Sequence, residues 1–429
     1  MISYTMQLTD EERSILEGAK GPTLRKAMES VVLYGETFKA ERLVPMEHAV
    51  HLVTSFGIPM LTPVFSIMDE LIQGGIKPGK PFTVDPRPMD FKNVPCSLIE
   101  RLVFKKIMYG KQEEYERQLL ATGLAGEDAF TCTCYLKEVG NTPKRGDILA
   151  WAESSAVVYA NSVLGARSNR NSGVIELLCG VVGKAPHFGL LTDEGRKASW
   201  VIDLRTSKLP EAQILGSAIG MKVIEDVPYI KGLSRFLGND ITDDVSDYLK
   251  DMGAASASNG AVGLFHVDGL TPEARDEGEK LILPQSQTYV IDDAEIERVK
   301  AGYPVMWKNP NAKPALAFIG CPHLSLHQLI AWVSRLESGL AASGRKSLAV
   351  STVFTAAPQV VKAFKAQAEL YERFVRTGAR LSSICPLMYM NNPLASKKAV
   401  ATNSNKLRTY TTARYYTDEE ITAIVTGGK

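Results

Sequence analysis

The marks of membrane, secreted and nucleic-acid-binding proteins are missing from this sequence of 429 residues. No apolar run approaches the roughly 20 residues that span a bilayer, and the N-terminus does not resemble a secretory signal. Lysine and arginine total 49 against 48 acidic residues, so a net charge of +1 creates no field that would attract nucleic acid or an anionic membrane. We find no internal repeat and no low-complexity segment. The composition, 45% apolar and 23% charged, is that of an ordinary globular enzyme, and the length predicts about two to four domains.

Cysteine is scarce, and no tight Cys-x-x-Cys pair of the kind found in zinc ribbons occurs. The six cysteines are Cys96, Cys132, Cys134, Cys179, Cys321 and Cys385. Their dispersal is unlike the dense disulfide framework of small secreted domains, so we expect a reducing, cytoplasmic setting. In such a setting, thiols that come together indicate metal binding or catalysis more often than a disulfide bridge.

The most informative stretch runs from residue 314 to residue 386. Its apolar pattern predicts strands over 315–319, 347–351 and 380–384, separated by two helices. The first helix begins after Ser325, with Gly339 as its terminator, and the second runs from Thr355 to Gly378. This βαβαβ order is typical of a parallel sheet, whose carboxyl edge is the usual ligand site.

Two of these three predicted strands end at a Cys-Pro dipeptide. Cys321-Pro322 follows the first strand and Cys385-Pro386 follows the third. The two thiols should therefore face one crevice, and Cys321 should lie just before a helix N-terminus, where the helix dipole favours a thiolate. A third cysteine site, Cys132 and Cys134, lies in a short β-prone piece in which both thiols would share one face.

Three cysteine sites that leave one metal position open suit iron–sulfur Lewis-acid chemistry. In such a site the cysteines hold the cluster while an exposed iron binds a substrate oxygen. The alternative is that the three sites are buried, unreactive thiols, because cysteine often serves as a small apolar core residue.

A polar cluster follows an apolar helical stretch in the middle of the chain. Asn161 and Ser162 stand among apolar residues, where a polar side chain usually has a bonding partner. Arg167 and Arg170 follow, with Ser168 between them, and arginine is the preferred planar receptor for carboxylate or phosphate. The alternative is a solvated helix end, which an isolated Arg-x-x-Arg fits equally well.

Two further polar sites lie toward the C-terminus. His266 stands near the exit of a strand that feeds a helix, where a lone histidine is more often structural than functional. Ser404 and Lys406 belong to a polar loop whose hydroxyl, amide and ammonium groups can hold an anion.

Taken together, these motifs resemble the large subunit of the aconitase X family, in family order over most of the chain. The resembling motifs are Thr131–Tyr135, Tyr159–Arg170, Leu264–Ala274, Gly320–His323, Cys385–Pro386 and Thr402–Lys406. The resemblance implies three α/β/α domains of the aconitase superfamily around a central cluster cleft, without the swivelling small domain. We expect an N-terminal region over 1–140, a middle domain over 141–295 and the βαβαβ domain over 296–429.

The resemblance also implies a hydro-lyase in which Cys132, Cys321 and Cys385 hold a [2Fe-2S] or [4Fe-4S] cluster or a mononuclear iron. Cys132 is preferred to Cys134 because the family usually has Cys-Thr-Pro-Tyr there, so Cys134 occupies a proline position. The catalytic base is expected to be a serine of a separate small subunit. The substrate-binding residues implied are Asn161, Ser162, Arg167, Ser168, Arg170, His266, Ser404 and Lys406.

Known substrates in the family are cis-3-hydroxy-L-proline and mevalonate 5-phosphate, and no cluster of basic residues here demands a phosphate. We therefore expect cis-3-hydroxy-L-proline, with mevalonate 5-phosphate as the alternative. A rival of another class is an aconitase-like iron sensor that binds RNA, which the near-zero net charge disfavours. A third reading is a zinc or mononuclear-iron hydratase with His323 as a metal ligand.

Overall fold

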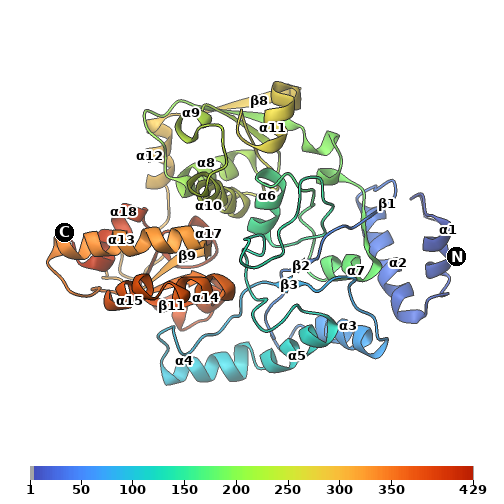
Figure 1. Ribbon diagram of the computed structural model, residues 1–429, viewed down its shortest axis with the longest axis horizontal. Coiled ribbons are helices and arrows are strands. Elements are labelled where there is room, and N and C mark those ends of the chain that lie inside the picture. The colour runs from blue at the N-terminus through green and yellow to red at the C-terminus, as the bar shows by residue number, and fades with distance from the viewer. Residues whose placement is uncertain (1–3, 429) are drawn as a thin grey trace.

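The computed structural model describes residues 4–428 and has a mixed α/β fold whose two larger sheets are parallel (Figure 1). In Figure 1 the chain starts in the blue helices on the right, passes through the yellow-green region at the top and ends in the orange and red region on the left. No helix within residues 4–428 is both long enough and apolar enough to cross a membrane.

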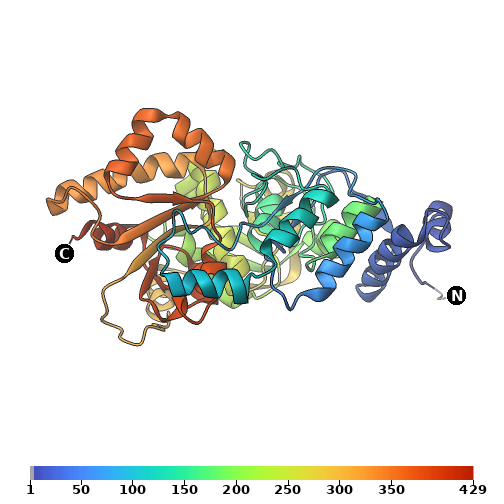
Figure 2. The ribbon, with the colours of Figure 1, turned by 90° about the horizontal axis from the view of Figure 1, so that it is seen from below.

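The C-terminal region is built on a five-stranded parallel sheet. Its elements are β9 Leu316–Leu324, α13 Leu326–Ser343, β10 Ser351–Ala356, α14 Pro358–Ala366, α15 Ala368–Arg376, β11 Arg380–Ser382, α16 Pro386–Met390, η5 Ala395–Lys397, β12 Val400–Thr402, α17 Asn405–Tyr410, β13 Arg414–Tyr415 and α18 Asp418–Thr426. The strand order is β11-β10-β9-β12-β13. The central strand β9 is buried along its whole length and packs on both faces: Ile319 joins the apolar cluster of α13–α15, and Phe318 joins the cluster on the opposite face. The orange helices cover one of these faces in Figure 2.

The predicted βαβαβ order and parallel pairing are confirmed, but the second strand lies further along the chain than predicted. The segment 347–351 was expected to be a strand, whereas β10 begins only at Ser351 and pairs with β9 and β11. The reason is that the backbone N–H of Leu348 donates to Thr377 O and that of Ala349 donates to Val425 O. These bonds tie the segment to neighbouring helices before the strand starts.

The two predicted helices also differ in extent. Ser325 caps α13 in a capping box with Gln328, as expected, but the helix passes through Gly339 and ends at Gly344, where φ is +67°. Gly339 is instead a close-packing position, because a Cβ there would lie 2.9 Å from the side chain of Thr426. The second helix begins at Pro358, since Thr355 stays in β10, and it breaks into α14 and α15 at Gln367.

Gly320, next to Cys321 in β9, has φ +106° and no space for a side chain. A Cβ would lie 2.6 Å from Thr355 O and 2.8 Å from Leu324 Cγ. Gly320→Ala should therefore lower the free energy of unfolding by about 2–5 kcal/mol, from backbone strain and overpacking together, as measured by urea denaturation. Gly344→Ala is the matched control, because it has a positive φ but nothing within 4 Å, and it should cost only about 1 kcal/mol. Equal losses from the two variants would contradict this reading.

The middle region carries the second parallel sheet. Its elements are β5 Ala198–Leu204, α8 Ala212–Val223, β6 Pro228–Lys231, α9 Ser234–Leu237, α10 Asp243–Asn259, β7 His266–Val267, α11 Pro272–Glu277, η4 Gly278–Leu281, β8 Ile282–Ile291 and α12 Asp293–Ala301. The strand order is β7-β6-β5-β8. Helices α8 and α10 approach closely because Gly216 has no side chain; a Cβ there would lie 2.1 Å from Met252 O. This packing brings α10 against the rest of the core.

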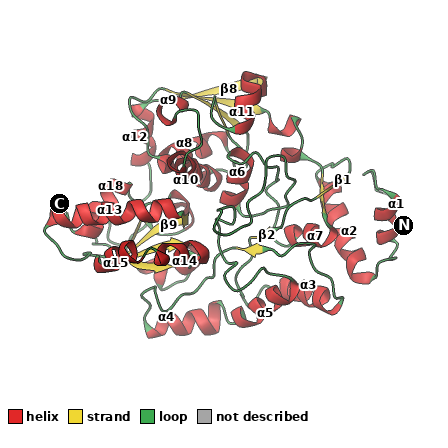
Figure 3. Cartoon of the chain, in the orientation of Figure 1, coloured by secondary structure: helices red, strands yellow, loops and turns green. Residues whose placement is uncertain are grey.

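The N-terminal region has only short strands and much loop, and the loops gather at the centre of the molecule (Figure 3). Its elements are α1 Asp10–Leu16, α2 Pro22–Thr37, β1 Leu43–Pro45, β2 His51–Leu52, α3 Thr62–Gln73, β3 Thr83–Val84, α4 Leu98–Leu102, the π-helix η1 Val103–Met108, α5 Gln112–Thr122, α6 Ser154–Ser162, α7 Ile175–Val182, β4 Lys184–Pro186, η2 Gly189–Leu191 and η3 Glu194–Arg196. The predicted β-prone piece over 130–135 is a bend and turn. Cys132 and Cys134 therefore do not share a face.

Glu176 of α7 is a buried carboxyl group in this region. Its Oε1 accepts a hydrogen bond from the N–H of Val53 at 3.1 Å, and its Oε2 has no hydrogen-bond partner among the described residues. Burial raises its pKa from 4.5 to about 8. The folded chain thus holds this proton more tightly than the unfolded chain, so stability falls as the pH rises from the ordinary pKa to the raised one.

Glu176→Gln should stabilise the protein above about pH 8 and have little effect near about pH 5. Glutamine stays uncharged and keeps an oxygen for the N–H of Val53, so the gain at high pH should be on the order of 3 kcal/mol. Urea midpoints at the two pH values measure it. A gain of the same size at both would mean that ionisation of Glu176 is not its cause.

Candidate active site

A cavity of about 370 Å³ lies where loops of the N-terminal region meet the carboxyl edge of the C-terminal sheet. This is the edge at which open α/β sheets bind ligands. Its thiol and ionisable lining residues are Asp85, Cys132, Glu153, Arg170, Cys321, His323, Cys385 and Lys406. The structure thus brings together residues that are far apart in the sequence, including a cysteine from each of the three predicted cysteine sites.

The three predicted cysteines line this one cavity. Cys321 comes from β9, Cys385 directly precedes α16, and Cys132 sits on the turn of the N-terminal region, where its sulfur accepts a hydrogen bond from His323 N–H at 3.3 Å. Cys134 does not line the cavity; it is fully buried in the apolar core beneath. Of the two thiols of the Cys-x-Cys motif, Cys132 is therefore the one that faces the cavity.

The predicted effect of a helix dipole on Cys321 is wrong. Helix α13 begins at Leu326, too far along the chain, and burial raises the pKa of the Cys321 thiol despite the nearby Lys406 ammonium. Burial likewise raises the pKa of Cys385, to about 12. The thiols would become thiolates by binding a cation, as coordinating cysteines do.

Three thiols around one cavity are a donor set suited to an iron centre. Within residues 4–428, no three His, Cys, Asp or Glu side chains converge closely enough to bind one ion between them. A cluster is wider than a single ion, because each cysteine can bind a different iron. Cys132, Cys321 and Cys385 are thus the thiol donors that this cavity offers.

Lys406 and Glu153 form a buried ion pair at the cavity wall, joined directly through Nζ and Oε1. Burial opposes the ionisation of Glu153, but the Lys406 ammonium and hydrogen bonds from Ser155 and Ala156 outweigh it and hold the pKa of Glu153 at about 2. The pKa of Lys406 is raised, against burial, by Glu153 and the neighbouring thiols. Lys406 is thus a fixed positive charge beside the cysteines.

Of the two arginines of the Arg-x-x-Arg motif, only Arg170 lines the cavity. Its sole hydrogen bond among the described residues is a long one, from Nη1 to Ala257 O at 3.5 Å. Arg167 points elsewhere: its guanidinium pairs with Asp193 at 2.6 Å and donates to Leu191 O at 3.1 Å. Arg170 is therefore the arginine with free donors to offer a ligand.

The other polar residues of that motif are buried and bonded internally. Asn161 donates to Ser168 O and Gly263 O and accepts from Ser168 N–H, each at 2.8 Å. Ser162 accepts from Phe265 N–H, and the Ser168 hydroxyl accepts from Trp151 N–H. These bonds satisfy the buried polar groups, as expected from their apolar surroundings, and they fold the loop that carries Arg170.

His266 and Ser404, also predicted to bind substrate, are not on the cavity wall. The Nε2 of His266 lies 2.8 Å from Arg196 O, and burial lowers the pKa of the ring, so the histidine is neutral and donates to this carbonyl. The structural role, more common for a lone histidine, applies here. The Ser404 hydroxyl caps α17 and donates to the carbonyl of Cys321, so it is bonded to the backbone of a cavity residue.

His323 is already bonded on both sides of its ring. Its Nδ1 lies 3.1 Å from the hydroxyl of Thr131 and its Nε2 lies 3.1 Å from Ile384 O. Burial lowers its pKa to about 4, so the ring is neutral. Both ring nitrogens are used within the protein, so the arrangement does not favour His323 as a metal ligand.

Sequence reasoning missed a further acidic residue of the cavity wall. Asp85 lines the cavity, burial raises its pKa to about 6, and its Oδ1 lies 3.3 Å from Nε2 of the buried His51. The Nδ1 of His51 lies 2.9 Å from the hydroxyl of Thr83, which accepts a hydrogen bond from Asn141. Asp85 directly follows the two-residue strand β3, and a polar residue at a strand end was the available signal.

Models of one protein family match this chain. The model described as "Aconitase X first domain" matches residues 5–194, and the one described as "Aconitase X second domain" matches residues 198–301. Together they cover well over half of the chain.

Similar proteins of assigned activity fall into two groups. The phosphomevalonate dehydratase large subunit of Thermococcus kodakarensis is 31% identical over 423 residues, covering 94% of this chain and 95% of the relative. The protein of the same name from Methanosarcina mazei is 31% identical over 416 residues, covering 94% and 92%. The cis-3-hydroxy-L-proline dehydratase of Pseudomonas aeruginosa is 27% identical over 411 residues, covering 93% of this chain but 65% of that longer protein.

A solved structure agrees with the fold. The crystal structure of Thermococcus kodakaraensis aconitase X in its holo-form superposes with a TM-score of 0.79 at 29% sequence identity. The match covers 98% of this chain and 99% of that one, so the two chains share their overall fold.

Proposed function

The chain belongs to the aconitase X family, whose named relatives are dehydratases, and we propose on this premise that it is the large subunit of a hydro-lyase acting on a small hydroxy acid. The observation that carries the proposal is that Cys132, Cys321 and Cys385 line one cavity with the cationic side chains of Arg170 and Lys406. The three thiols would hold an iron–sulfur cluster, which when bound supplies a Lewis acid for the departing hydroxyl group.

The protein's own residues would bind and orient the substrate. The free donors of Arg170 would bind the carboxylate in two parallel hydrogen bonds. Lys406, fixed by Glu153, would offset negative charge that gathers beside the thiols. Phe56, Leu387 and Met388 would make the mouth apolar and limit access of water to the reacting atoms.

The base that removes the proton would come from a separate small subunit. Two serines line the cavity, but Ser55 donates its hydroxyl hydrogen to Pro86 O at 2.8 Å and Ser154 lies beside Glu153. The name "large subunit" of the relatives from Thermococcus and Methanosarcina supports a small partner. We propose a serine of that partner as the base, in a reducing cytoplasmic setting that keeps the six cysteines as thiols.

We propose cis-3-hydroxy-L-proline as the substrate. Among residues 4–428, the cavity wall offers one free cation, Arg170, because Lys406 is already paired with Glu153. This matches a substrate with a single carboxylate. The carboxyl of Asp85, which also lines the cavity, would suit the ring nitrogen of an amino acid.

Mevalonate 5-phosphate is the second candidate. It is favoured by the higher identity to the phosphomevalonate dehydratase large subunits and by the nearly complete coverage of those chains. A phosphate in addition to a carboxylate would need further cationic groups, which the small subunit would have to supply.

The test is a dehydration assay of the anaerobically purified complex with both substrates side by side, together with iron and sulfide determination. We expect a brown protein that converts cis-3-hydroxy-L-proline. Turnover of mevalonate 5-phosphate alone would make that compound the substrate in place of cis-3-hydroxy-L-proline. Iron without sulfide would indicate a mononuclear iron centre and not a cluster. A colourless, iron-free complex without activity on either compound would overturn the proposal. Salt-dependent RNA binding by the metal-free chain would instead favour the iron-sensor alternative.

A further inference from the structure

The short helix α4 and the π-helix η1 present an apolar side to solvent. Leu98, Ile99, Leu102 and Ile107, which we call the α4 patch, are 82%, 68%, 61% and 68% exposed. By contrast Glu100, in the same helix, is only 4% exposed and pairs with Lys398. A surface helix normally has the opposite pattern, with apolar residues inward and charges outward.

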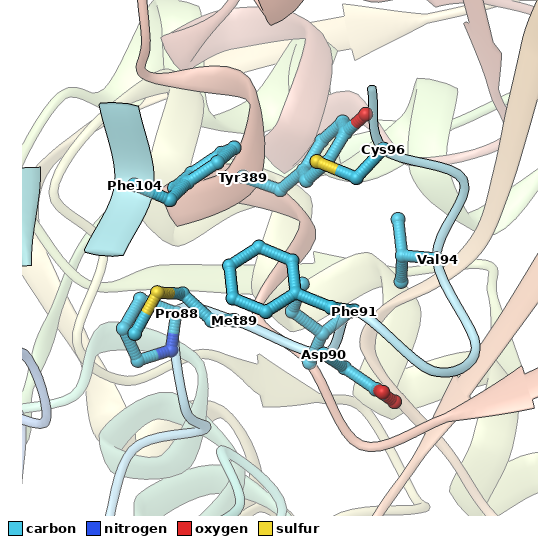
Figure 4. A pocket seen from close by; sticks show the side chains of 9 residues that line it. Pro88, Met89, Asp90, Phe91, Val94, Cys96, Phe104 and Tyr389 are labelled. Atoms are coloured by element: carbon cyan, nitrogen blue, oxygen red, sulfur yellow. The ribbon is translucent and has the colours of Figure 1, made fainter. Parts of the chain in front are cut away.

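The inner side of the same helices is firmly held. Phe104 stacks on Tyr389 at 5.6 Å, and both surround a small apolar pocket with Phe91 and Cys96 (Figure 4). Because this inner side is packed, the exposure of the α4 patch does not come from fraying of the helix. The π-helical geometry of η1, itself common near functional sites, adds an extra residue per turn.

The helices that carry the patch are connected to the active-site cavity through an apolar cluster. The apolar cluster that contains Phe104 and Tyr389 continues into Leu387, Met388 and Phe56, which line the cavity. A protein bound on the α4 patch would therefore contact helices whose inner side belongs to the same apolar cluster as part of the cavity wall.

Basic side chains surround the patch. Arg101, Lys105 and Lys106 are exposed, and none of them forms an ion pair with an acidic group within residues 4–428. A partner for this surface should therefore combine an apolar centre with acidic residues at its edge.

We propose that the α4 patch is the docking surface for the small subunit, which thereby reaches the cavity with its base. The inference rests on the proposed function. Two observations select this occupant. First, relatives of nearly the same length are named large subunits. Second, the match to the cis-3-hydroxy-L-proline dehydratase includes 93% of this chain but only 65% of that protein. The remainder of that longer protein is where a covalently joined counterpart of the small subunit would lie.

The test uses the purified full chain and the purified small subunit of the same enzyme, with affinity measured by fluorescence anisotropy and assembly by analytical ultracentrifugation. The double variant Leu98→Glu, Leu102→Glu should weaken binding by about 100-fold, because it places charges at the centre of the contact. Val375→Glu is the matched control, since Val375 is an exposed apolar residue of α15, and it should bind as the wild type does. Arg101→Glu with Lys105→Glu should slow association and weaken its salt dependence.

Unchanged affinity of the double variant would overturn the proposal. A second result would also overturn it: the wild-type chain forms dimers, the double variant does not, and both bind the small subunit equally well. The patch would then bind a second copy of this chain. Failure of the proposed function looks different: the complex would form and be weakened by the variants, yet dehydrate neither substrate.

Discussion

An anaerobically purified Cys321→Ser complex is expected to be colourless and to lose dehydratase activity by roughly 1,000-fold, because Lewis-acid activation contributes several kcal/mol. Cys321 lies at the carboxyl edge of the central strand and is 8% exposed, with its carbonyl held by Ser404. Serine would fit the same space, so the fold should persist. What it lacks is the soft thiolate that iron–sulfur clusters require.

The measurement is the visible absorption spectrum together with the rate of dehydration, and circular dichroism confirms folding. Cys96→Ser serves as the matched control, since Cys96 lines the small apolar pocket beside Tyr389 and not the active-site cavity. It should keep both colour and rate. An unchanged spectrum in Cys321→Ser would remove this thiol from the cluster, and the same loss in both variants would point to a general effect of replacing cysteine.

Replacing Arg170 by alanine should reduce kcat/KM by about 100-fold, mainly through KM, because a charged, paired hydrogen bond to the substrate carboxylate would be lost. Its neighbour provides an unusually close control. Arg167 has the same side chain three positions earlier but pairs with Asp193, which is 84% exposed, and such exposed pairs contribute little. Arg167→Ala should therefore stay within about threefold of the wild type.

Arg170→Lys refines this test. Lysine restores the charge but not the planar fork, so a partial recovery of KM is expected. If Arg167→Ala had the larger effect, the substrate carboxylate would have to lie on the side of Asp193, and the assignment of the cavity would need to change. The readout is steady-state kinetics of the complex with both candidate substrates.

The sequence pattern predicted the C-terminal region well because its signals are local. Apolar runs, a serine cap and the two Cys-Pro dipeptides all act within a few residues of where they occur, and they were enough to bring Cys321 and Cys385 to one sheet edge. The misplaced second strand depended on hydrogen bonds from Leu348 and Ala349 to distant helices, which no local pattern contains.

The candidate site was only partly predictable for the same reason. Lys406 and Arg170 were identified from the sequence, but their surroundings were not. Glu153 lies more than a hundred positions from its partner Lys406. His51 lies more than thirty positions from its neighbour Asp85. Asn161 shows the converse limit. A polar residue in an apolar context needs a partner, and the sequence does not say whether that partner is a ligand or, as here, the backbone.

The outward-facing leucines of α4 also bear on how the chain behaves before it is assembled. Chaperones and proteases recognise helices whose apolar side is exposed to water. Such a side also associates with other exposed apolar surfaces. An orphan copy would therefore be short-lived or prone to aggregate, whereas a small subunit bound at the proposed docking surface would shield it. The stoichiometry of the two subunits in the cell could in this way be kept in balance by protein turnover alone.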